Sequence, residues 1–140
     1  MRRYLLDTHI LVWFLNEDSS LNTYISEGIS YFQNDYYISI EVLREIIALQ
    51  VSGKIDLDLD IIEIVQILKN HNIRILPIEL SHIEVLENLS VPIINQKKQL
   101  DPSDSIMIAQ AIAENMTMIS SDLKFPHYKD DNFKLLQNLI

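Results

Sequence analysis

Short β-rich runs alternate with helical patterns along this chain of 140 residues, and this order constrains the fold more than any other feature of the sequence. The runs expected to be strands are Arg3–Leu6, Tyr36–Ser39, Ile73–Leu76 and Thr117–Ser120, with Phe133–Gln137 as a weaker strand at an edge. Strands that alternate with helices form mostly parallel sheets covered on both faces. The sequence therefore predicts an α/β fold with a mostly parallel, four- to five-stranded sheet.

The expected helices lie between these strands and follow the apolar spacing of helical periodicity. Ser81–Glu84 has the spacing of a capping box and marks the start of one of them. Asp101 is the expected N-cap of another, with Pro102 at its first position, and Ser90–Leu100 before it is expected to be a polar loop. The predicted helices are His9–Leu15, Leu21–Phe32, Glu41–Ser52, Leu59–Asn70, Ser81–Leu89 and the stretch from Pro102 to Ala113.

The composition excludes several classes of protein. The chain has no cysteine, which rules out disulfides, thiolate zinc sites and cysteine nucleophiles, and fits a reducing cytoplasm. Gly28 and Gly53 are its only glycines, too few for a nucleotide-cradling G-x-x-x-x-G-K-[ST] or G-x-G-x-x-G loop. No apolar run approaches the roughly 18 residues that a membrane span needs, and the first residues lead into a strand rather than a signal-peptide core. We expect a single cytoplasmic domain, residues 1–140, with no membrane association.

The charge balance argues against a general nucleic-acid binder. The chain has 20 acidic and 11 basic residues, a formal net charge of −9. Lys and Arg supply most of the non-specific affinity of proteins for nucleic-acid phosphates. Any role on nucleic acid must therefore rest on local positive charge or on a bound metal ion.

Four carboxylates fall at places where predicted strands end or helices begin, namely Asp7, Glu45, Asp104 and Asp122. In an open parallel sheet, ligands bind beyond the carboxyl ends of the strands, so residues far apart in sequence converge there. Carboxylate oxygens are ligands that suit Mg²⁺ or Mn²⁺. The sequence therefore predicts a metal site at this edge of the sheet.

Each of these acids also has a purely structural interpretation. Asp7, directly after a buried strand, either meets a cation or caps the following helix. Asp104, in the first turn of a helix, would be stabilised by the helix dipole alone, and Asp7 is expected to have the smaller capping role of the two. Asp122 is compatible with an ordinary turn. Glu41 and Glu45 lie one helical turn apart, and their spacing does not show which one faces the crevice.

Other enzyme classes fit the sequence less well. Serine hydrolysis would need a histidine base, an oriented third group and a G-x-S-x-G elbow that the chain lacks. A phosphatase that forms an aspartyl-phosphate needs a second Asp two residues after Asp7, where this chain has His9. A response-regulator receiver needs an acidic pair after the first strand and a Lys after a late strand, whereas Ser120-Ser121-Asp122 ends in an acid. We expect His9 to be a surface or core residue rather than a ligand.

Four segments, Tyr4–Trp13, Ser39–Ile46, Asp101–Ala111 and Thr117–Asp122, resemble in content and order the motifs of the PIN-domain family. The similarity runs nearly end to end and is greatest to VapC-like toxins, whose chains begin with an L-L-D-T-H-x-L-x-W segment. The resemblance implies a three-layer α/β/α fold and an endoribonuclease that uses Mg²⁺ or Mn²⁺. It also implies a homodimer, and a cognate antitoxin encoded next door that plugs the acidic crevice.

The resemblance further implies a role for each acid. It selects Glu45 over Glu41, as a general base or outer ligand of the metal. Asp7 and Asp104 would be the main metal ligands, and Asp122 a further ligand or the residue that orients a ligand water. In that chemistry a metal-bound hydroxide attacks the RNA phosphorus in line. The implied site comprises the catalytic residues Asp7, Glu45, Asp104 and Asp122, the metal ligands Asp7, Asp104 and Asp122, and two hydrogen-bond donors to ligand water or substrate, Thr8 and Ser121.

The chain departs from the family pattern in its D-P-F-D-R segment, which here reads Asp-Pro-Ser-Asp-Ser. Ser103 replaces the usual aromatic residue, and Ser105 replaces the usual arginine beside the catalytic Asp104. The basic stretch that often precedes this segment is reduced to Lys97-Lys98-Gln99-Leu100. The carboxylates are untouched, but the missing arginine leaves open a second hypothesis, a PIN-fold binding module that sequesters RNA or an antitoxin-like peptide without cutting.

Overall fold

The computed structural model describes residues 2–98, 101–128 and 130–139. Within these residues a parallel sheet has the strand order β3-β2-β1-β6-β7, so β1 lies at its centre. This confirms the predicted parallel sheet, and the weak C-terminal strand is the edge strand β7. The strands are β1 (Arg3–Leu6), β2 (Asp35–Ser39), β3 (Ile73–Leu76), β6 (Thr117–Ser120) and β7 (Lys134–Gln137).

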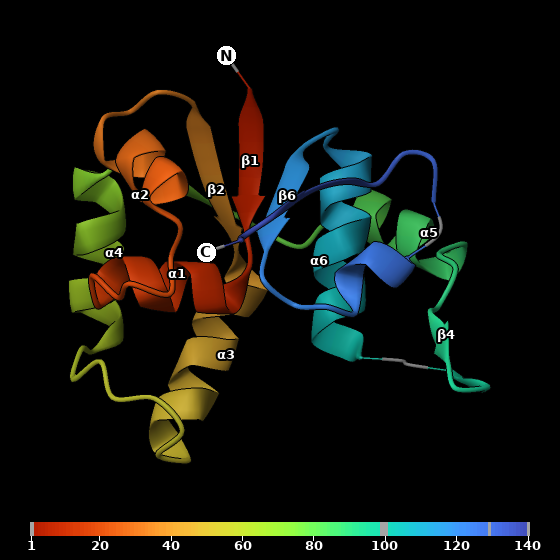
Figure 1. Ribbon diagram of the computed structural model, residues 1–140, viewed down its shortest axis with the longest axis horizontal. Helices are drawn as coiled ribbons and strands as arrows, with labels where there is room; N and C mark the ends of the chain where they lie inside the picture. The colour runs from red at the N-terminus through yellow and green to blue at the C-terminus, as the bar shows by residue number, and fades with distance from the viewer. Residues whose placement is uncertain (1, 99–100, 129, 140) are drawn as a thin grey trace.

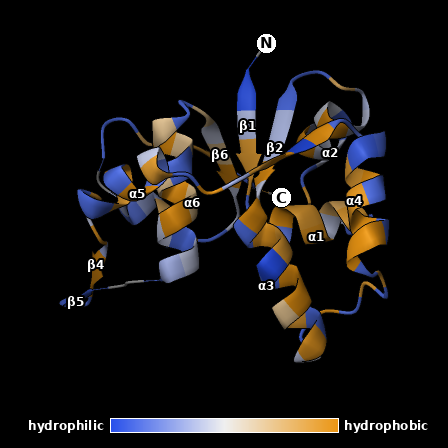
Figure 2. Ribbon diagram, turned by 180° about the vertical axis from the view of Figure 1, so that it is seen from behind, coloured by the Kyte–Doolittle hydropathy of each residue, from blue (hydrophilic) through white to orange (hydrophobic). Residues whose placement is uncertain are grey.

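Helices cover both sides of this sheet, as the α/β/α prediction requires. Figures 1 and 2 show α1, α2 and α4 on one side of the strands and α5 and α6 on the other, with α3 extending from one end of the sheet. The helices are α1 (Thr8–Leu15), α2 (Thr23–Ser30), α3 (Ile40–Val51), α4 (Ile61–Asn70), α5 (Leu80–Glu87), α6 (Pro102–Ala113) and the short 3₁₀ helix η1 (Phe125–His127). The predicted helices agree with these bounds to within two residues at each end.

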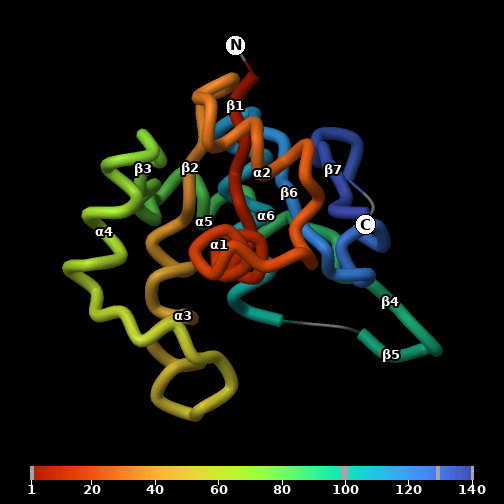
Figure 3. The backbone as a smooth tube through the Cα atoms, turned by 60° about the vertical axis from the view of Figure 1, so that its left-hand side comes forward, coloured from red at the N-terminus to blue at the C-terminus, as the bar shows by residue number. Residues whose placement is uncertain are grey.

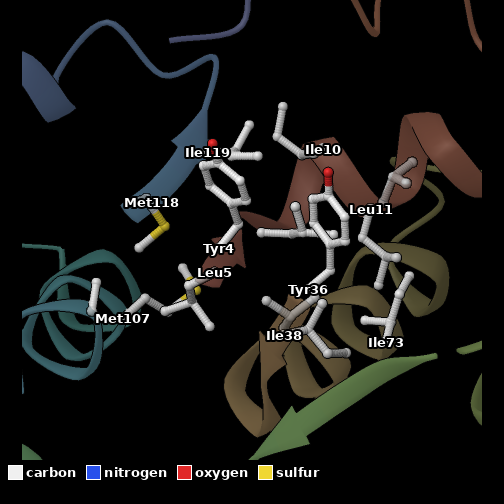
Figure 4. Packing of buried hydrophobic residues seen from close by; sticks show 14 of the residues in the cluster. Tyr4, Leu5, Ile10, Leu11, Tyr36, Ile38, Ile73, Met107, Met118 and Ile119 are labelled. Atoms are coloured by element: carbon white, nitrogen blue, oxygen red, sulfur yellow. The ribbon is translucent and has the colours of Figure 1, made fainter. Parts of the chain in front are cut away.

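The central strand β1 supplies side chains to both sides of the core. Leu5 is fully buried and points toward Met107 of α6, whereas the ring of Tyr4 stacks on Tyr36 at a centroid distance of 5.6 Å (Figure 4). Successive side chains of a strand point to opposite faces, so an uninterrupted apolar run is needed where both faces are covered. The run Tyr4-Leu5-Leu6 is therefore the sequence of a buried central strand.

The predicted capping box at Ser81–Glu84 is wrong. The N-cap of α5 is Glu79, and its amide donates to Nδ1 of His82 over 3.0 Å. The other ring nitrogen of this fully buried histidine, Nε2, lies 3.1 Å from Oε2 of Glu114 at the end of α6. The helix start is thus set by a tertiary contact between α5 and α6 rather than by the local spacing of Ser and Glu.

The predicted polar loop Ser90–Leu100 contains a small hairpin. Its strands are β4 (Ile93–Ile94) and β5 (Lys97–Lys98), which pair antiparallel. Asn95 and Gln96 between them have φ angles of 54° and 64°. Positive φ at both central residues is the requirement of a two-residue type I′ turn, and Asn is among the residues that tolerate it. Gln99 and Leu100, the remainder of the predicted loop, lie outside the described residues.

The carboxyl ends of the parallel strands lie at one edge of the sheet, at the bottom of Figure 1. Helices α1 and α3 begin there, directly after β1 and β2, and α6 begins at the same end of the molecule (Figures 1 and 3). The edge is therefore lined by helix N-termini and by the residues that end the strands. In the part of the chain that the structure describes, no helix is long and apolar enough to cross a membrane.

Candidate functional site

Asp7 is held rigidly at the centre of this edge, where it is only 7% exposed. Its amide donates to the carbonyl oxygen of Ile119 over 3.0 Å, which continues the pairing of β1 with β6. Its carboxylate accepts from the amide of Thr8 at 2.8 Å and from Oγ of Ser120 at 2.7 Å. Burial raises the pKa of Asp7 and the charge of Asp122 adds to the rise, while these hydrogen bonds oppose it. Asp7 is both the cap of α1 and a member of the acidic cluster.

Glu45 is connected to Asp7 through Thr8. The hydroxyl of Thr8 donates to Oε1 of Glu45 over 2.8 Å and so joins the start of α1 to α3. Burial raises the pKa of Glu45, and the negative charge of Asp7 raises it further, against the opposing effect of the Thr8 hydrogen bond. The structure therefore brings Glu45 together with Asp7, which the helical spacing alone could not establish.

Glu41 has a different environment, because it bridges α3 to the start of α6. Its Oε1 accepts from Oγ of Ser103 at 3.0 Å and from the guanidinium of Arg44, which also donates to the same Ser103 hydroxyl over 2.9 Å. Ser105 is buried, and its hydroxyl lies 3.3 Å from that of Tyr128. The two serines that replace the aromatic residue and arginine of the family pattern thus have definite structural partners.

Asp104 has little to stabilise its charge. Asp101 caps α6 as predicted, accepting from the amide of Asp104 at 3.0 Å, so the Asp104 carboxylate has no capping role. This reverses the expectation that Asp104 would be the better cap and Asp7 the lesser one. Burial, followed by the charges of Asp101, Asp7 and Asp122, raises the pKa of Asp104 to about 8. A carboxylate in this position favours either a proton or a nearby cation.

Asp122 reaches the cluster from the turn after β6, together with a lysine that the sequence did not single out. The amide of Asp122 donates to Oγ of Ser120 over 3.0 Å, so this one hydroxyl connects Asp122 to Asp7. The ammonium of Lys124 lies 3.9 Å from Oδ2 of Asp104 and 4.0 Å from Oδ2 of Asp122. A positive charge therefore lies between two of the mutually repelling acids.

Two residues considered at the sequence level take no part in these contacts. Ser121 is half-buried and, among the described residues, forms no side-chain hydrogen bond, whereas its neighbour Ser120 forms two. His9 is exposed, and its charge has a small lowering effect on the pKa of Asp7. No sequence signal separated Ser120 from Ser121, since Ser120 is the last residue of β6 and Ser121 is the next residue along the chain.

The donor chemistry of the cluster fits a hard divalent cation. Asp7, Asp104 and Asp122 offer carboxylate oxygens. Burial is the main cause of the raised pKa values of Asp7 and Asp104, and neighbouring acids add to both rises. Within residues 2–98, 101–128 and 130–139, however, no three acidic or histidine side chains are already arranged as a metal-binding group. Lys124 lies between two of the acids, so a metal ion at this site would compete with its ammonium.

Comparisons with known proteins find a matching sequence family and solved structures of the same fold. The sequence model of the PIN domain family matches residues 4–131, which is most of the chain. No curated protein sequence matches the chain significantly.

Several solved structures have the same fold. The chain is 21% identical to one in VapBC2 from Rickettsia felis, bound to a DNA fragment from its promoter, with a TM-score of 0.73 over 98% of this chain and 99% of that one. It is 14% identical to a chain in DNA-bound VapBC from Salmonella typhimurium, with a TM-score of 0.65 over 98% of both chains. A toxin–antitoxin complex from Klebsiella pneumoniae gives 14% identity and a TM-score of 0.59 over 96% of both chains. At these identities the likeness concerns the fold.

Proposed function

The chain belongs to the PIN domain family, and we propose that it is a Mg²⁺- or Mn²⁺-dependent endoribonuclease that acts as the toxin of a toxin–antitoxin pair. One observation carries this proposal: four acids from different segments, Asp7, Glu45, Asp104 and Asp122, lie at the carboxyl edge of the sheet. The charge of Asp7 raises the pKa of Glu45 and of Asp104, and the charge of Asp122 raises the pKa of Asp7 and of Asp104. Clusters that contain titratable groups with raised pKa values, as Asp7, Glu45 and Asp104 have, are typical of catalytic sites.

Asp7, Asp104 and Asp122 are the residues that would hold the metal ion. When bound, the ion lowers the pKa of a water molecule and stabilises the charge that develops on the phosphate oxygens. The hydroxyl of Ser120 donates to the carboxylate of Asp7 and accepts from the amide of Asp122, so it links these two residues. Ser121 remains a candidate for hydrogen bonding to the substrate.

Glu45 is the proposed proton acceptor. Its Oε1 is occupied by the hydroxyl of Thr8, which fixes the carboxylate in position. The raised pKa of Glu45 brings it closer to neutral pH, where a general base is most effective. Thr8 is thus a positioning residue for Glu45.

Two observations support the proposed partners: the negative charge at the carboxyl edge of the sheet, and the complexes in which proteins of similar structure were solved. A cluster of acids on a chain of net charge −9 attracts a basic peptide, which is the electrostatic character we propose for an antitoxin segment. The relatives were solved as VapBC or toxin–antitoxin complexes. We propose a cognate antitoxin, an RNA substrate and a homodimer for this chain, acting in the cytoplasm.

The nuclease proposal is tested on a bulk RNA preparation. Purified protein should cut the RNA when Mg²⁺ or Mn²⁺ is present and should be inactive in EDTA. Asp7→Asn, purified in parallel, should remove nearly all of the activity because it takes one charge from the metal ligands. Equal cleavage by wild type and variant would identify a contaminating nuclease and contradict the proposal.

The toxin proposal is tested in a bacterial host. Expression of the chain should slow growth, and co-expression of the small open reading frame beside its gene should restore it. Harmless accumulation of folded protein at high level would contradict a toxin role while leaving the nuclease assay as an independent result.

A specific observation favours a second candidate, a binding module that holds RNA or an antitoxin-like peptide without cutting. Lys124 partly neutralises Asp104 and Asp122, and Ser105 replaces the family's arginine. The discriminating result is RNA binding by the protein with no cleavage at any Mn²⁺ concentration. Metal-dependent cleavage excludes this candidate.

A further inference from the structure

The opposite edge of the sheet carries a cavity of about 500 Å³, lined by Arg2, Arg3, Asn115, Thr117 and Lys134. Three of these residues, Arg3, Thr117 and Lys134, are the first residues of β1, β6 and β7. The parallel registers place them together, because Tyr4 pairs with Thr117 and Thr117 pairs with Lys134. The cavity therefore lies at the amino ends of the strands, away from the acidic cluster at their carboxyl ends.

Two of the cations around this cavity are oriented by neutral acceptors. The guanidinium of Arg3 donates to the backbone carbonyl of Glu114. The ammonium of Lys134 donates to Oδ1 of Asn115 over 2.8 Å. Both acceptors belong to the turn between α6 and β6, where Asn115 has a φ of 54°. A carbonyl and an amide hold these side chains in place without cancelling their charge.

The neighbouring acids leave the cations unneutralised. The carboxylate of Glu114 is directed to His82, 3.1 Å from Nε2. Asp35 is the register partner of Arg3, but among the described residues no carboxylate lies within ion-pair distance of Arg2, Arg3 or Lys134. Arg44 and Lys124, by contrast, are each paired with acids at the other edge. The cavity is thus a concentrated positive region on a strongly acidic chain.

We propose that this cavity binds backbone phosphates of RNA at a point remote from the cutting edge. The choice of RNA rests on the proposed function, whereas the choice of phosphate rests on the cavity itself. Arginine forks match the oxygens of a phosphate, and lysine, amide and hydroxyl groups supply further donors. Such contacts position a nucleic acid without reading its sequence. They also supply the local positive charge that a nucleic-acid substrate needs on a chain of net charge −9.

The experiment measures binding of a fluorescently labelled single-stranded RNA by anisotropy in EDTA, where no metal-dependent cleavage occurs. The test protein carries Arg2→Gln and Lys134→Gln, which remove two charges but leave Arg3 to hold the turn after α6. The matched control carries Lys54→Gln and Lys69→Gln, which remove two exposed charges elsewhere on the surface. Circular dichroism and the melting temperature confirm that both proteins are folded.

The test protein should bind RNA at least about fivefold more weakly than wild type. The slope of its log affinity against log salt concentration should also be shallower by about 1.4, because each of the two lost phosphate contacts contributes about 0.7 to the slope. The control should stay within about twofold of wild type at the same salt. Equal weakening in test and control proteins would show a diffuse charge effect and overturn the site.

Inorganic pyrophosphate distinguishes RNA from a small phosphate ligand in the same variants. Binding of pyrophosphate that is lost in the test protein, with RNA affinity unchanged, would overturn the assignment to RNA. Failure of the nuclease proposal would appear separately, as a lack of RNA cleavage in the presence of Mn²⁺. Weakened RNA binding by the test protein would support phosphate binding in this cavity even if the protein does not cleave RNA.

Discussion

The ammonium of Lys124 lies 3.9 Å from Oδ2 of Asp104, in a cluster where nearly every other nearby charge is negative. Burial and three neighbouring acids raise the pKa of Asp104, and among the causes of its shift Lys124 is the one charge that acts in the opposite direction. In the metal-free protein this lysine therefore serves as a counter-ion. A divalent cation at the same place would relieve the repulsion between the acids more completely, but it would either displace the ammonium of Lys124 or be repelled by it.

Replacement of Lys124 by Gln should therefore tighten Mn²⁺ binding. The measurement is made at about pH 9, above the pKa of about 8 for Asp104, so that protons compete less with the metal ion for this carboxylate. The affinity of the variant for Mn²⁺ should then be about fivefold higher than that of wild type, or about 1 kcal/mol. Isothermal titration calorimetry measures the affinity, and Lys54→Gln controls for the loss of one surface charge. Unchanged or weaker Mn²⁺ binding in the Lys124 variant would show that the lysine does not compete with metal.

The metal-free protein should become less stable as the pH rises toward 8. Asp104 has a folded-state pKa of about 8 and an ordinary value of 3.8, so between these pH values the folded state holds a proton that the unfolded state has released. Stability then falls with increasing pH. In EDTA the melting temperature should drop by at least about 3 °C between roughly pH 5.5 and 8. Asp104→Asn should flatten this dependence, and parallel curves for variant and wild type would contradict the assignment.

Removal of the Thr8 hydroxyl should alter Glu45, the proposed proton acceptor, while leaving the proposed metal ligands in place. Thr8→Val keeps the shape of this buried side chain but deletes the 2.8 Å hydrogen bond that lowers the pKa of Glu45. The acidic limb of the pH–rate profile should shift to higher pH, because Glu45 must lose its proton to act as a base. Mn²⁺ affinity, measured by titration, should change by less than about twofold. An unshifted profile would remove Glu45 from the role of base.

The sequence predicted those parts of the site that depend on the order of strands and helices. The apolar run before Asp7 and the capping residues before Asp104 are local signals, and parallel topology then brings the two acids to one edge. The fold was predictable for the same reason, down to the edge strand β7. Selection of Glu45 over Glu41 came from the family resemblance, and the hydrogen bond to Thr8 supplies a structural basis for it.

The remainder depends on contacts between side chains that only the folded chain brings together. Lys124 belongs to the site because the turn after β6 directs it toward α6, and Ser120 because its hydroxyl faces Asp7 while that of Ser121 does not contact it. The start of α5 is set by His82, whose partner Glu114 is 32 residues away. Local spacing carries no information about such partners.

The most direct test of the central claim is the initial rate of cleavage of a labelled single-stranded RNA as Mn²⁺ is titrated into wild type and Asp104→Asn, prepared identically. Wild type should be inactive in EDTA and should reach a plateau rate as Mn²⁺ saturates the site. The variant should be slower by at least about a hundredfold at the same Mn²⁺ concentration, a loss of about 2.7 kcal/mol of transition-state stabilisation. Cleavage that persists in EDTA, or a variant as fast as wild type, would contradict the claim that this acidic edge is a metal-dependent ribonuclease site.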